Sequence, residues 1–266
     1  MYPTYFHLAA YSASLVFGST LTPVAALVDQ VLTRTSANNY ILPQPGRLMG
    51  WYAAGVNISD AQINTPSLRY VGLPFAAFLN NSLTIPSPPG IAWWGTQGPP
   101  IPKVDEIQIL HSLGGAANEQ EFSLLWFQFA QVPPAAGVIY RLKFTATITA
   151  VANTWTSGSI VPFATLPQGV YQVVGGDCIG ANIVAWRLIF PGSFYRPGAL
   201  GRNAVGNVPY YPFTAGGLGV WGQFASVNLP LLEIVATGAN TAQTLYLDLI
   251  RIGDYPGPTP ALTLAA

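Results

Sequence analysis

Few side chains in this 266-residue chain carry nucleophilic or metal-binding chemistry, and its only histidines and cysteine are His7, His111 and Cys178. Ser112 follows His111 directly, and Asp105 and Glu106 lie one expected strand upstream, so a Ser/His/Asp nucleophile is the arrangement to consider. A catalytic triad depends on the spatial geometry of separated residues, which an adjacent Ser and His do not provide. We therefore interpret the region around His111 as a polar turn at the end of a strand.

The remaining candidates for chemistry are equally thin. Cys178 follows Gly175-Gly176-Asp177 without the flanking signature of a catalytic thiol, so we interpret it as a small apolar residue in a β-turn region. The carboxylates are dispersed, and no ligand cluster has zinc or EF-hand spacing. The glycine-rich run at residues 216–219 lacks the Lys-Ser/Thr pair of a phosphate-binding loop. We therefore expect no enzymatic activity, no cofactor and no metal.

Aromatic side chains gather in two Pro/Gly-rich loops, expected at residues 85–102 and 191–222. They could stack on sugar rings, as in a carbohydrate-binding β-sandwich, or bury against neighbouring subunits, where Tyr and Trp are also enriched. Few amides and carboxylates lie beside them to bind sugar hydroxyls, which favours subunit contacts. The interface candidates, including two arginines flanked by aromatic residues, are Trp93, Trp94, Arg187, Tyr195, Arg196, Tyr210, Tyr211 and Trp221.

The composition is poor in charge, with 8% charged against 50% hydrophobic residues and a formal net charge of zero. Binding to phosphates requires a basic patch, and none is visible, so we expect no direct contact with nucleic acid. The apolar runs are broken by 27 Gly and 24 Pro, and none reaches the length of a membrane-spanning helix. The missing charge indicates a surface that is covered by other chains.

Hydrophobic alternation predicts β-strands along most of the chain. The clearest case is residues 139–150, where Tyr140, Leu142 and Phe144 alternate with polar residues at the period of a half-buried strand. Residues 22–35 fit a helix by their apolar spacing and a strand by comparison with the second half, and both interpretations stay open. Further strands are expected within residues 48–73, 104–110, 121–132, 169–174, 181–190, 231–236 and 244–252.

The second half of the chain repeats landmarks of the first half in the same order. Leu42-Pro43-Gln44 recurs as Leu166-Pro167-Gln168, and Asn57-Ile58 recurs as Asn182-Ile183, at nearly the same spacing (167 − 43 = 124 and 182 − 57 = 125). Such a repeat predicts two similar structural units in tandem. The expected organisation is an N-terminal arm at 1–21, a first β-unit at 22–132, a linker at 133–137, a second β-unit at 138–253 and a C-terminal tail at 254–266.

This pattern resembles the double jelly-roll major capsid proteins of tailless icosahedral viruses, many of which enclose a membrane. The resemblance is architectural. It rests on the paired stretches 42–74 and 166–197 and on the paired terminal strands 121–130 and 244–252. It implies an all-β fold of two tandem eight-stranded jelly-roll β-barrels with long Pro/Gly/aromatic loops.

The resemblance also implies a function. The chain would be a structural protein of the virion that self-assembles as trimeric, pseudo-hexameric capsomers into an icosahedral shell. The implied partners are the homotrimer, neighbouring capsomers, penton or minor capsid proteins and, through the N-terminal arm, an internal membrane where the virus has one. A carbohydrate-binding β-sandwich, either a lectin or a binding module, is the alternative that the aromatic loops leave open.

Overall fold

The structure of the chain is a computed structural model that describes residues 6–16, 18–69, 75–81, 90–115, 118–130, 132–204 and 210–254. It is 55% strand and 4% helix, so the prediction of an all-β fold is confirmed. The chain divides into a first unit, Leu8–Phe129, and a second unit, Ala130–Ala266 together with Met1–His7. No helix among the described residues is long and apolar enough to cross a membrane.

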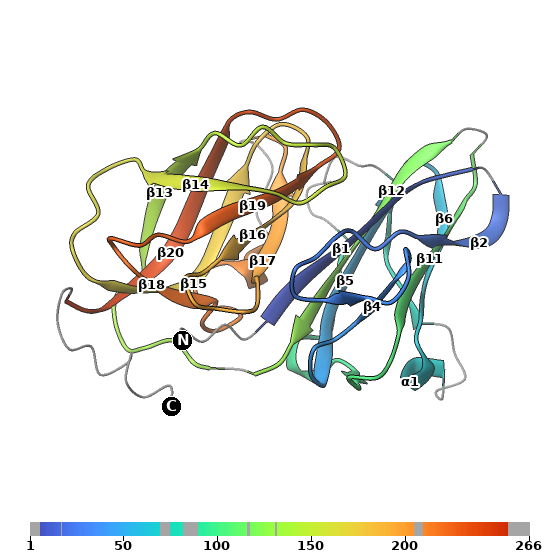
Figure 1. The fold of residues 1–266 in the computed structure, drawn as a ribbon, viewed down its shortest axis with the longest axis horizontal. Coiled ribbons are helices and arrows are strands. Elements are labelled where there is room, and N and C mark those ends of the chain that lie inside the picture. Colours follow the sequence, from blue (N-terminus) through green and yellow to red (C-terminus); the bar gives the residue numbers. More distant parts are fainter. Residues whose placement is uncertain are drawn as a thin grey trace. The chain divides into compact units, whose positions relative to one another are not determined.

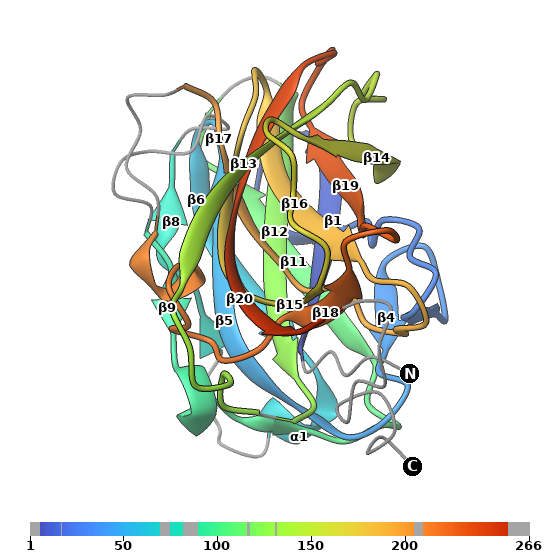
Figure 2. The same cartoon turned by 90° about the vertical axis from the view of Figure 1, so that its left-hand side faces the viewer.

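The second unit contains a closed barrel. Its strands are β13 (Tyr140–Ala146), β14 (Thr156–Pro162), β15 (Val170–Ile179), β16 (Ile183–Ile189), β17 (Gly198–Arg202), β18 (Gly222–Ala225), β19 (Leu231–Ala236) and β20 (Gln243–Gly253). They pair in the order β17-β16-β19-β14-β13-β20-β15-β18, and Figure 2 shows β13 and β20 side by side. Because β15 also pairs with β17, seven of these strands close on themselves and β18 extends from β15.

The first unit consists of two sheets (Figure 1). One sheet has the order β1-β12-β5-β10, with β8 and β9 also paired to β5, and the other has the order β3-β4-β11-β6-β7, with β2 also paired to β11. The strands are β1 (Phe6–Leu15), β2 (Gly18–Val24), β3 (Thr33–Arg34), β4 (Asn39–Ile41), β5 (Gly46–Gly55), β6 (Ile58–Asn64), β7 (Phe75–Ala76), β8 (Leu79–Asn80), β9 (Ala92–Trp93), β10 (Pro100–Ile101), β11 (Ile107–Leu113) and β12 (Glu119–Gln128). Short helices are α1 (Pro66–Arg69), η1 (Gly95–Gln97) and, in the second unit, η2 (Tyr211–Phe213).

The two units share one strand order. In the second unit the strands, counted along the chain, pair as 1-8-3-6 and 2-7-4-5. The first unit has the same orders when short strands that pair with the same neighbour are counted as one. β2 and β4, which both pair with β11, then take the second position, and β9 and β10, which both pair with β5, take the sixth. The fifth strand also pairs in the same way in both units. In the second unit, β17 pairs with β16 and, in parallel, with β15. In the first unit this strand is divided in two: β7 pairs with β6, and β8 pairs in parallel with β5.

An asparagine with left-handed backbone conformation marks the same corner in both units. Asn57 (φ 60°) precedes β6, and Asn182 (φ 63°) precedes β16. Each donates its backbone N–H to the side-chain oxygen of an asparagine that follows the fifth strand, Asn81 or Asn203. Each also accepts, at its carbonyl, a hydrogen bond from an N–H just after the seventh strand, at 2.7 Å in the first unit and 2.9 Å in the second. The sequence repeat therefore corresponds to a repeated set of hydrogen bonds.

The N-terminal prediction needs correction. Residues 1–21 were expected to form an irregular or extended arm, but Phe6–Leu15 is strand β1 and residues from Gly18 belong to β2. Nearly every residue of β1 is buried, so the alternation that identifies a half-exposed strand is missing there. Residues 22–35, left open between helix and strand, contain the end of β2 and the short strand β3 and no helix. The expected linker, residues 133–137, lies inside the second unit just after its start.

The loop predictions also need correction. The stretch 191–222 contains strand β17 and helix η2, and its residues 205–209 lie outside the described chain. The stretch 85–102 contains β9, η1 and β10, and both of these strands pair with β5. Its residues 85–89 lie outside the described chain. Cys178 is not in a turn region but in strand β15, and a register shift between Val173 and Gly175 accommodates the glycines.

We predict that the corner at Asn182 is sensitive to its backbone conformation. Asn182→Ala loses the side-chain hydrogen bond to the Ala239 carbonyl and puts alanine at positive φ. We expect it to lower the free energy of unfolding by about 1–2 kcal/mol in urea titrations. Asn182→Gly also loses that bond but tolerates positive φ, so it should be less destabilised than the alanine variant. Equal losses in the two variants would contradict the role of φ.

Candidate functional site

The described residues hold little that could do covalent or metal chemistry. No group of three or more His, Cys, Asp or Glu side chains in the described ranges is placed to hold a metal ion. Cys178 is fully buried, and burial together with the nearby Asp177 carboxylate raises the pKa of its thiol well above the ordinary value. A thiol in this environment stays protonated and is a poor nucleophile.

One Ser–His–Glu arrangement exists, and it differs from the one considered from sequence. His111, on β11, contacts neither of the expected partners Asp105 and Glu106. Its Nδ1 lies 3.1 Å from Oε2 of Glu121 on β12, and its Nε2 lies 2.8 Å from Oγ of Ser123. Trp51 on β5 donates its indole N–H to the same Oγ at 2.9 Å. All four side chains are completely buried inside the first unit.

The protonation of this cluster is opposite to that of a catalytic triad. Burial lowers the pKa of His111 to about 3, and burial together with the Glu119 charge raises the pKa of Glu121 to about 8. At neutral pH both groups are therefore uncharged, so Glu121 donates its proton to Nδ1 and the Nε2–H of His111 donates to Ser123. The imidazole cannot accept a proton from Ser123 in this tautomer, and no substrate reaches it, so the cluster is structural.

Three of the interface candidates lie in the interior of the second unit, which corrects their expected role. Trp221 is completely buried and stacks on Trp186, with ring centres 5.5 Å apart. Arg187 is also completely buried, with its guanidinium 3.9 Å from the centre of the Trp155 ring. Arg187 and Arg196 both donate to the carboxylate of Glu233, at 2.5 Å and 2.9 Å. The two arginines therefore make their ion pair and aromatic contact inside the unit.

The other interface candidates are partly exposed, except Tyr211, whose side chain lies outside the described part of the chain. Trp93 and Trp94 are half-buried on the first unit, and the Trp93 ring packs edge-on against Trp126 at 5.9 Å. In the second unit Tyr195 lies edge-on to Phe194 at 5.8 Å. Tyr210 packs on Phe213 at 5.3 Å, while Tyr211 begins η2 and its side chain lies outside the described part of the chain. Trp93 and Trp94 thus belong to the first unit, and the tyrosines belong to the second.

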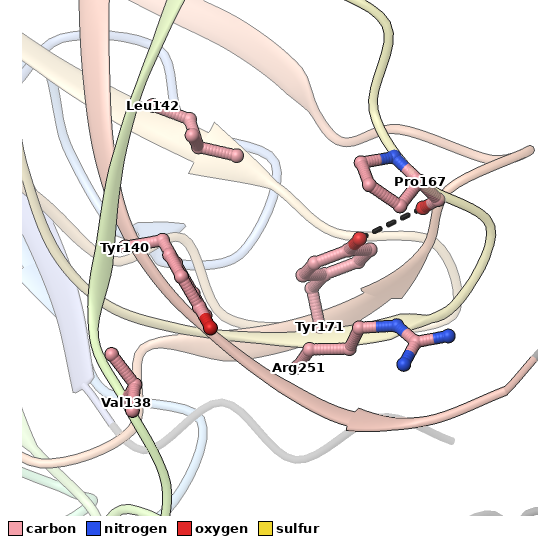
Figure 3. A pocket seen from close by; sticks show the side chains of 6 residues that line it. All are labelled: Val138, Tyr140, Leu142, Pro167, Tyr171 and Arg251. Carbon is pink, nitrogen blue, oxygen red and sulfur yellow. Dashed lines mark hydrogen bonds between the residues drawn. The ribbon is translucent and has the colours of Figure 1, made fainter.

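The candidate site that the structure adds is an open apolar groove of about 660 Å³ on the second unit. In Figure 3, side chains from β13 line one wall, and side chains from the segment before β15, from β15 and from β20 line the other. Two tyrosine rings and one guanidinium are its polar features. The lining residues are Val138, Tyr140, Leu142, Pro167, Tyr171 and Arg251.

The groove exists because β14 covers only part of β13. β14 pairs with Phe144–Ala146, and the last backbone bond runs from the N–H of Phe163 to the carbonyl of Lys143 at 2.9 Å. In the described chain, no strand pairs with Tyr140–Leu142 on that side, whereas β20 pairs with them on the other. Core-facing side chains of β13 are consequently left uncovered at this end: Tyr140 is 52% exposed and Val138, just before the strand, is 65% exposed.

Two of the three polar side chains of the groove, Tyr171 and Arg251, already have hydrogen-bond partners in the same unit. The Tyr171 hydroxyl donates to the Pro167 carbonyl at 2.8 Å, a bond drawn in Figure 3, and burial raises the pKa of this hydroxyl although Arg251 opposes the shift. Arg251 donates to the Gln168 carbonyl at 2.9 Å and pairs with Asp254. The groove therefore offers rings and aliphatic surface, which suits an apolar peptide segment better than a polar small molecule.

Sequence reasoning did not single out these residues as a site. It placed Tyr140 and Leu142 on the core-facing side of a strand, which agrees with the burial of Phe144 and Ala146 further along the same face. The signal that was available is the run Val138-Ile139-Tyr140, three large apolar residues in succession just after a Pro/Gly-rich segment. All three are at least 40% exposed.

Comparisons with known proteins do not identify the chain: no protein-family model matches it, and no curated protein matches it.

We predict a pH dependence of stability from the buried Glu121. Its raised pKa stabilises the folded state fully below about pH 4.5, and that contribution is lost as pH rises through 8. The lowered pKa of His111 acts in the opposite direction between about pH 3 and 6.5, so the two effects offset one another between about pH 4.5 and 6.5. Between pH 6.5 and 8 only the Glu121 effect remains, and the free energy of unfolding should fall by about 1.4 kcal/mol per pH unit.

The substitution Glu121→Gln tests this assignment, because it keeps the shape of the side chain and removes its titration. Urea denaturation of this variant between pH 6.5 and 8 should show a nearly constant free energy of unfolding. Glu106→Gln, which changes an exposed carboxylate, should keep the slope of the unmodified chain. A slope in Glu121→Gln as steep as in the unmodified chain would contradict the assignment.

Proposed function

We propose that this chain is a viral major capsid protein that self-assembles as trimeric, pseudo-hexameric capsomers into an icosahedral shell. The observation that carries the proposal is the strand order that both units share, 1-8-3-6 and 2-7-4-5, which forms two sheets in the first unit and two parts of one barrel in the second. In this order the last strand lies between the first and the third, which is the connectivity of a jelly roll made from two Greek keys. This shared order supports the proposal that the two units are jelly rolls in tandem, the architecture that the sequence resembles.

The charge distribution supports assembly. Seven of the chain's ten basic and ten acidic side chains are buried within the described residues, namely Asp105, Glu121, Asp177, Arg187, Arg196, Glu233 and Asp248. The charges that remain outside the buried set are few, because the whole chain has only 8% charged residues. Large apolar side chains are exposed instead, among them Val104 (80%), Phe163 (70%) and Phe78 (64%). Contact with other copies would cover such side chains.

The arrangement of a shell follows from two units per chain. Three chains place six β-units around a three-fold axis, which gives a tile with nearly six-fold edges. Such tiles meet one another through the walls of their β-units, where buried apolar area stabilises the contact and few charges have to be desolvated. In this proposal the partners are the two other chains of the trimer, neighbouring capsomers, and penton or minor capsid proteins, and the protein is located in the virion.

The carbohydrate-binding alternative needs exposed aromatic rings, and Trp221 is not exposed. Stacking on a sugar requires an exposed ring face, and Trp221 has none because it is completely buried against Trp186 and Phe6. Trp93 is partly covered by Trp126. No observation on the described residues favours this alternative over assembly.

The proposal predicts that the purified chain is a homotrimer. Light scattering coupled to size-exclusion chromatography should give three times the 28.3 kDa mass of one chain. Raising the ionic strength should leave the trimer intact, because contacts between charge-poor surfaces are screened very little by salt. Electron microscopy of concentrated samples should then show shells or sheets of six-sided tiles. A monodisperse monomer at all concentrations would refute the proposal.

A further inference from the structure

The uncovered edge of β13 can accept another strand. Backbone groups of alternate residues point to the same side of a strand. Because the Lys143 carbonyl faces β14, the N–H and C=O of Arg141 also face that side, where no strand of the described chain pairs with Tyr140–Leu142. The apolar groove lies at this edge, so a strand added here would gain backbone hydrogen bonds and bury its side chains on Tyr140 and Leu142.

The segment that follows β20 has a sequence suited to this edge. Residues 255–266 read YPGPTPALTLAA and contain no charged side chain. The even positions 256, 258, 260, 262 and 264 are Pro, Pro, Pro, Leu and Leu, while the odd positions from 257 to 265 are Gly, Thr, Ala, Thr and Ala. In an extended conformation the large apolar side chains from Pro256 to Leu264 would therefore share one face, and the small or polar ones the other.

The prolines add a second restriction. A proline has no N–H, so a strand with proline at three alternate positions lacks donors along one edge. Its other edge keeps the donors of Gly257, Thr259 and Ala261. Between residues 256 and 261, such a segment therefore has backbone donors for one neighbouring strand only. Proline rings also pack well on tyrosine rings, which the groove supplies at Tyr140 and Tyr171.

We propose that the groove and the free edge of β13 bind residues 255–266 of a second copy of the chain. The prolines and leucines of that segment face the groove, and its small residues face outward. This inference rests on the proposed function, because it assigns one contact by which copies of the chain are joined.

The reach of the chain favours a second copy. Arg251 contacts both Asp254 and the Gln168 carbonyl, which holds the end of the described chain on the β15 side of β20, away from β13. A strand added beyond β13 lies two strand spacings, about 10 Å, from β20. Pro256 is two residues beyond Asp254, a reach of about 7 Å at most. The same chain therefore cannot place its whole apolar face, from Pro256 to Leu264, in its own groove.

Paired substitutions on opposite faces of the segment test this geometry in the full-length chain. Pro258→Asp combined with Pro260→Asp puts two carboxylates against the apolar walls, so we expect the dissociation constant of the oligomer to rise at least tenfold in analytical ultracentrifugation. Thr259→Asp combined with Ala261→Asp adds the same charge on the outward face and should leave the dissociation constant within about threefold of the unmodified value. On the groove side, Val138→Asp should weaken the oligomer and Val227→Asp, at a comparably exposed position, should not.

Disulfide trapping identifies the chain that supplies the segment. A chain with Val138→Cys is co-expressed with a differently tagged chain carrying Leu262→Cys, and mild oxidation should yield a covalent dimer of the two tags on a denaturing gel. Replacing Leu262→Cys by Thr263→Cys, on the outward face, should reduce the yield severalfold, because the bond requires Cα atoms within about 7 Å. Cys178 does not interfere, since it is completely buried.

The outcomes separate this inference from the proposed function. Loss of assembly with the groove-facing pair only, together with dimers of mixed tags, supports both. A persistent trimer with no effect of either pair and no trapped dimer overturns the inference and leaves the proposed function intact. A single chain that carries both Val138→Cys and Leu262→Cys is the control. If its cross-link forms only within single chains, the chain's own segment fills the groove, and the inference is overturned. Absence of any oligomer in the unmodified chain overturns both.

Discussion

The structure depends on the insertion of the last strand of each unit between that unit's first and third strands. β12 pairs with β1 and β5, and β20 pairs with β13 and β15, so residues far apart in the sequence become neighbours, such as Tyr140 and Leu249. The entropy of closing such a long loop grows only with the logarithm of its length. The insertion buries Leu245, Leu247 and Leu249 completely, which repays that entropy through apolar area. Neither core is complete until its last strand arrives.

The same packing explains why so few charges remain on the surface. Strands that are buried on both faces carry the polar residues that appear in them into the interior, where they have to be neutral or paired. Glu121 and His111 are neutral and hydrogen-bonded, whereas Glu233 is paired with two arginines. On the second unit, Asp177 and Asp248 are both paired with Arg141, and Asp177 also with Arg202. Because these ions are used inside each unit, the contacts available to other chains are mainly apolar.

The sequence predicted the parts of the fold that have a local signature. The strand at residues 231–236 agrees with β19, and the alternation from residue 139 onward agrees with the burial of β13. Prediction failed in β1, where buried residues do not alternate with exposed ones. It also failed for Trp221 and Arg187, which were expected on the surface because they lie in or near Gly/Pro-rich stretches and are buried instead. The groove could not be predicted, because it arises from the point at which β14 stops pairing with β13. That point is set by the register of three strands and not by the sequence of any one of them.

An uncovered strand edge beside apolar side chains is a hazard in a β-protein, because any extended chain can pair with it and the pairing can propagate. The second unit removes this hazard around most of its barrel by closing seven strands on themselves, and leaves it at Tyr140–Leu142. A partner that lacks donors along most of one edge reduces the remaining problem, since it covers the open strand and offers few backbone donors to a further strand. The alternate prolines at 256, 258 and 260 provide this property. They limit strand addition to a single step, which is what a closed assembly of defined size requires and what an open fibre lacks.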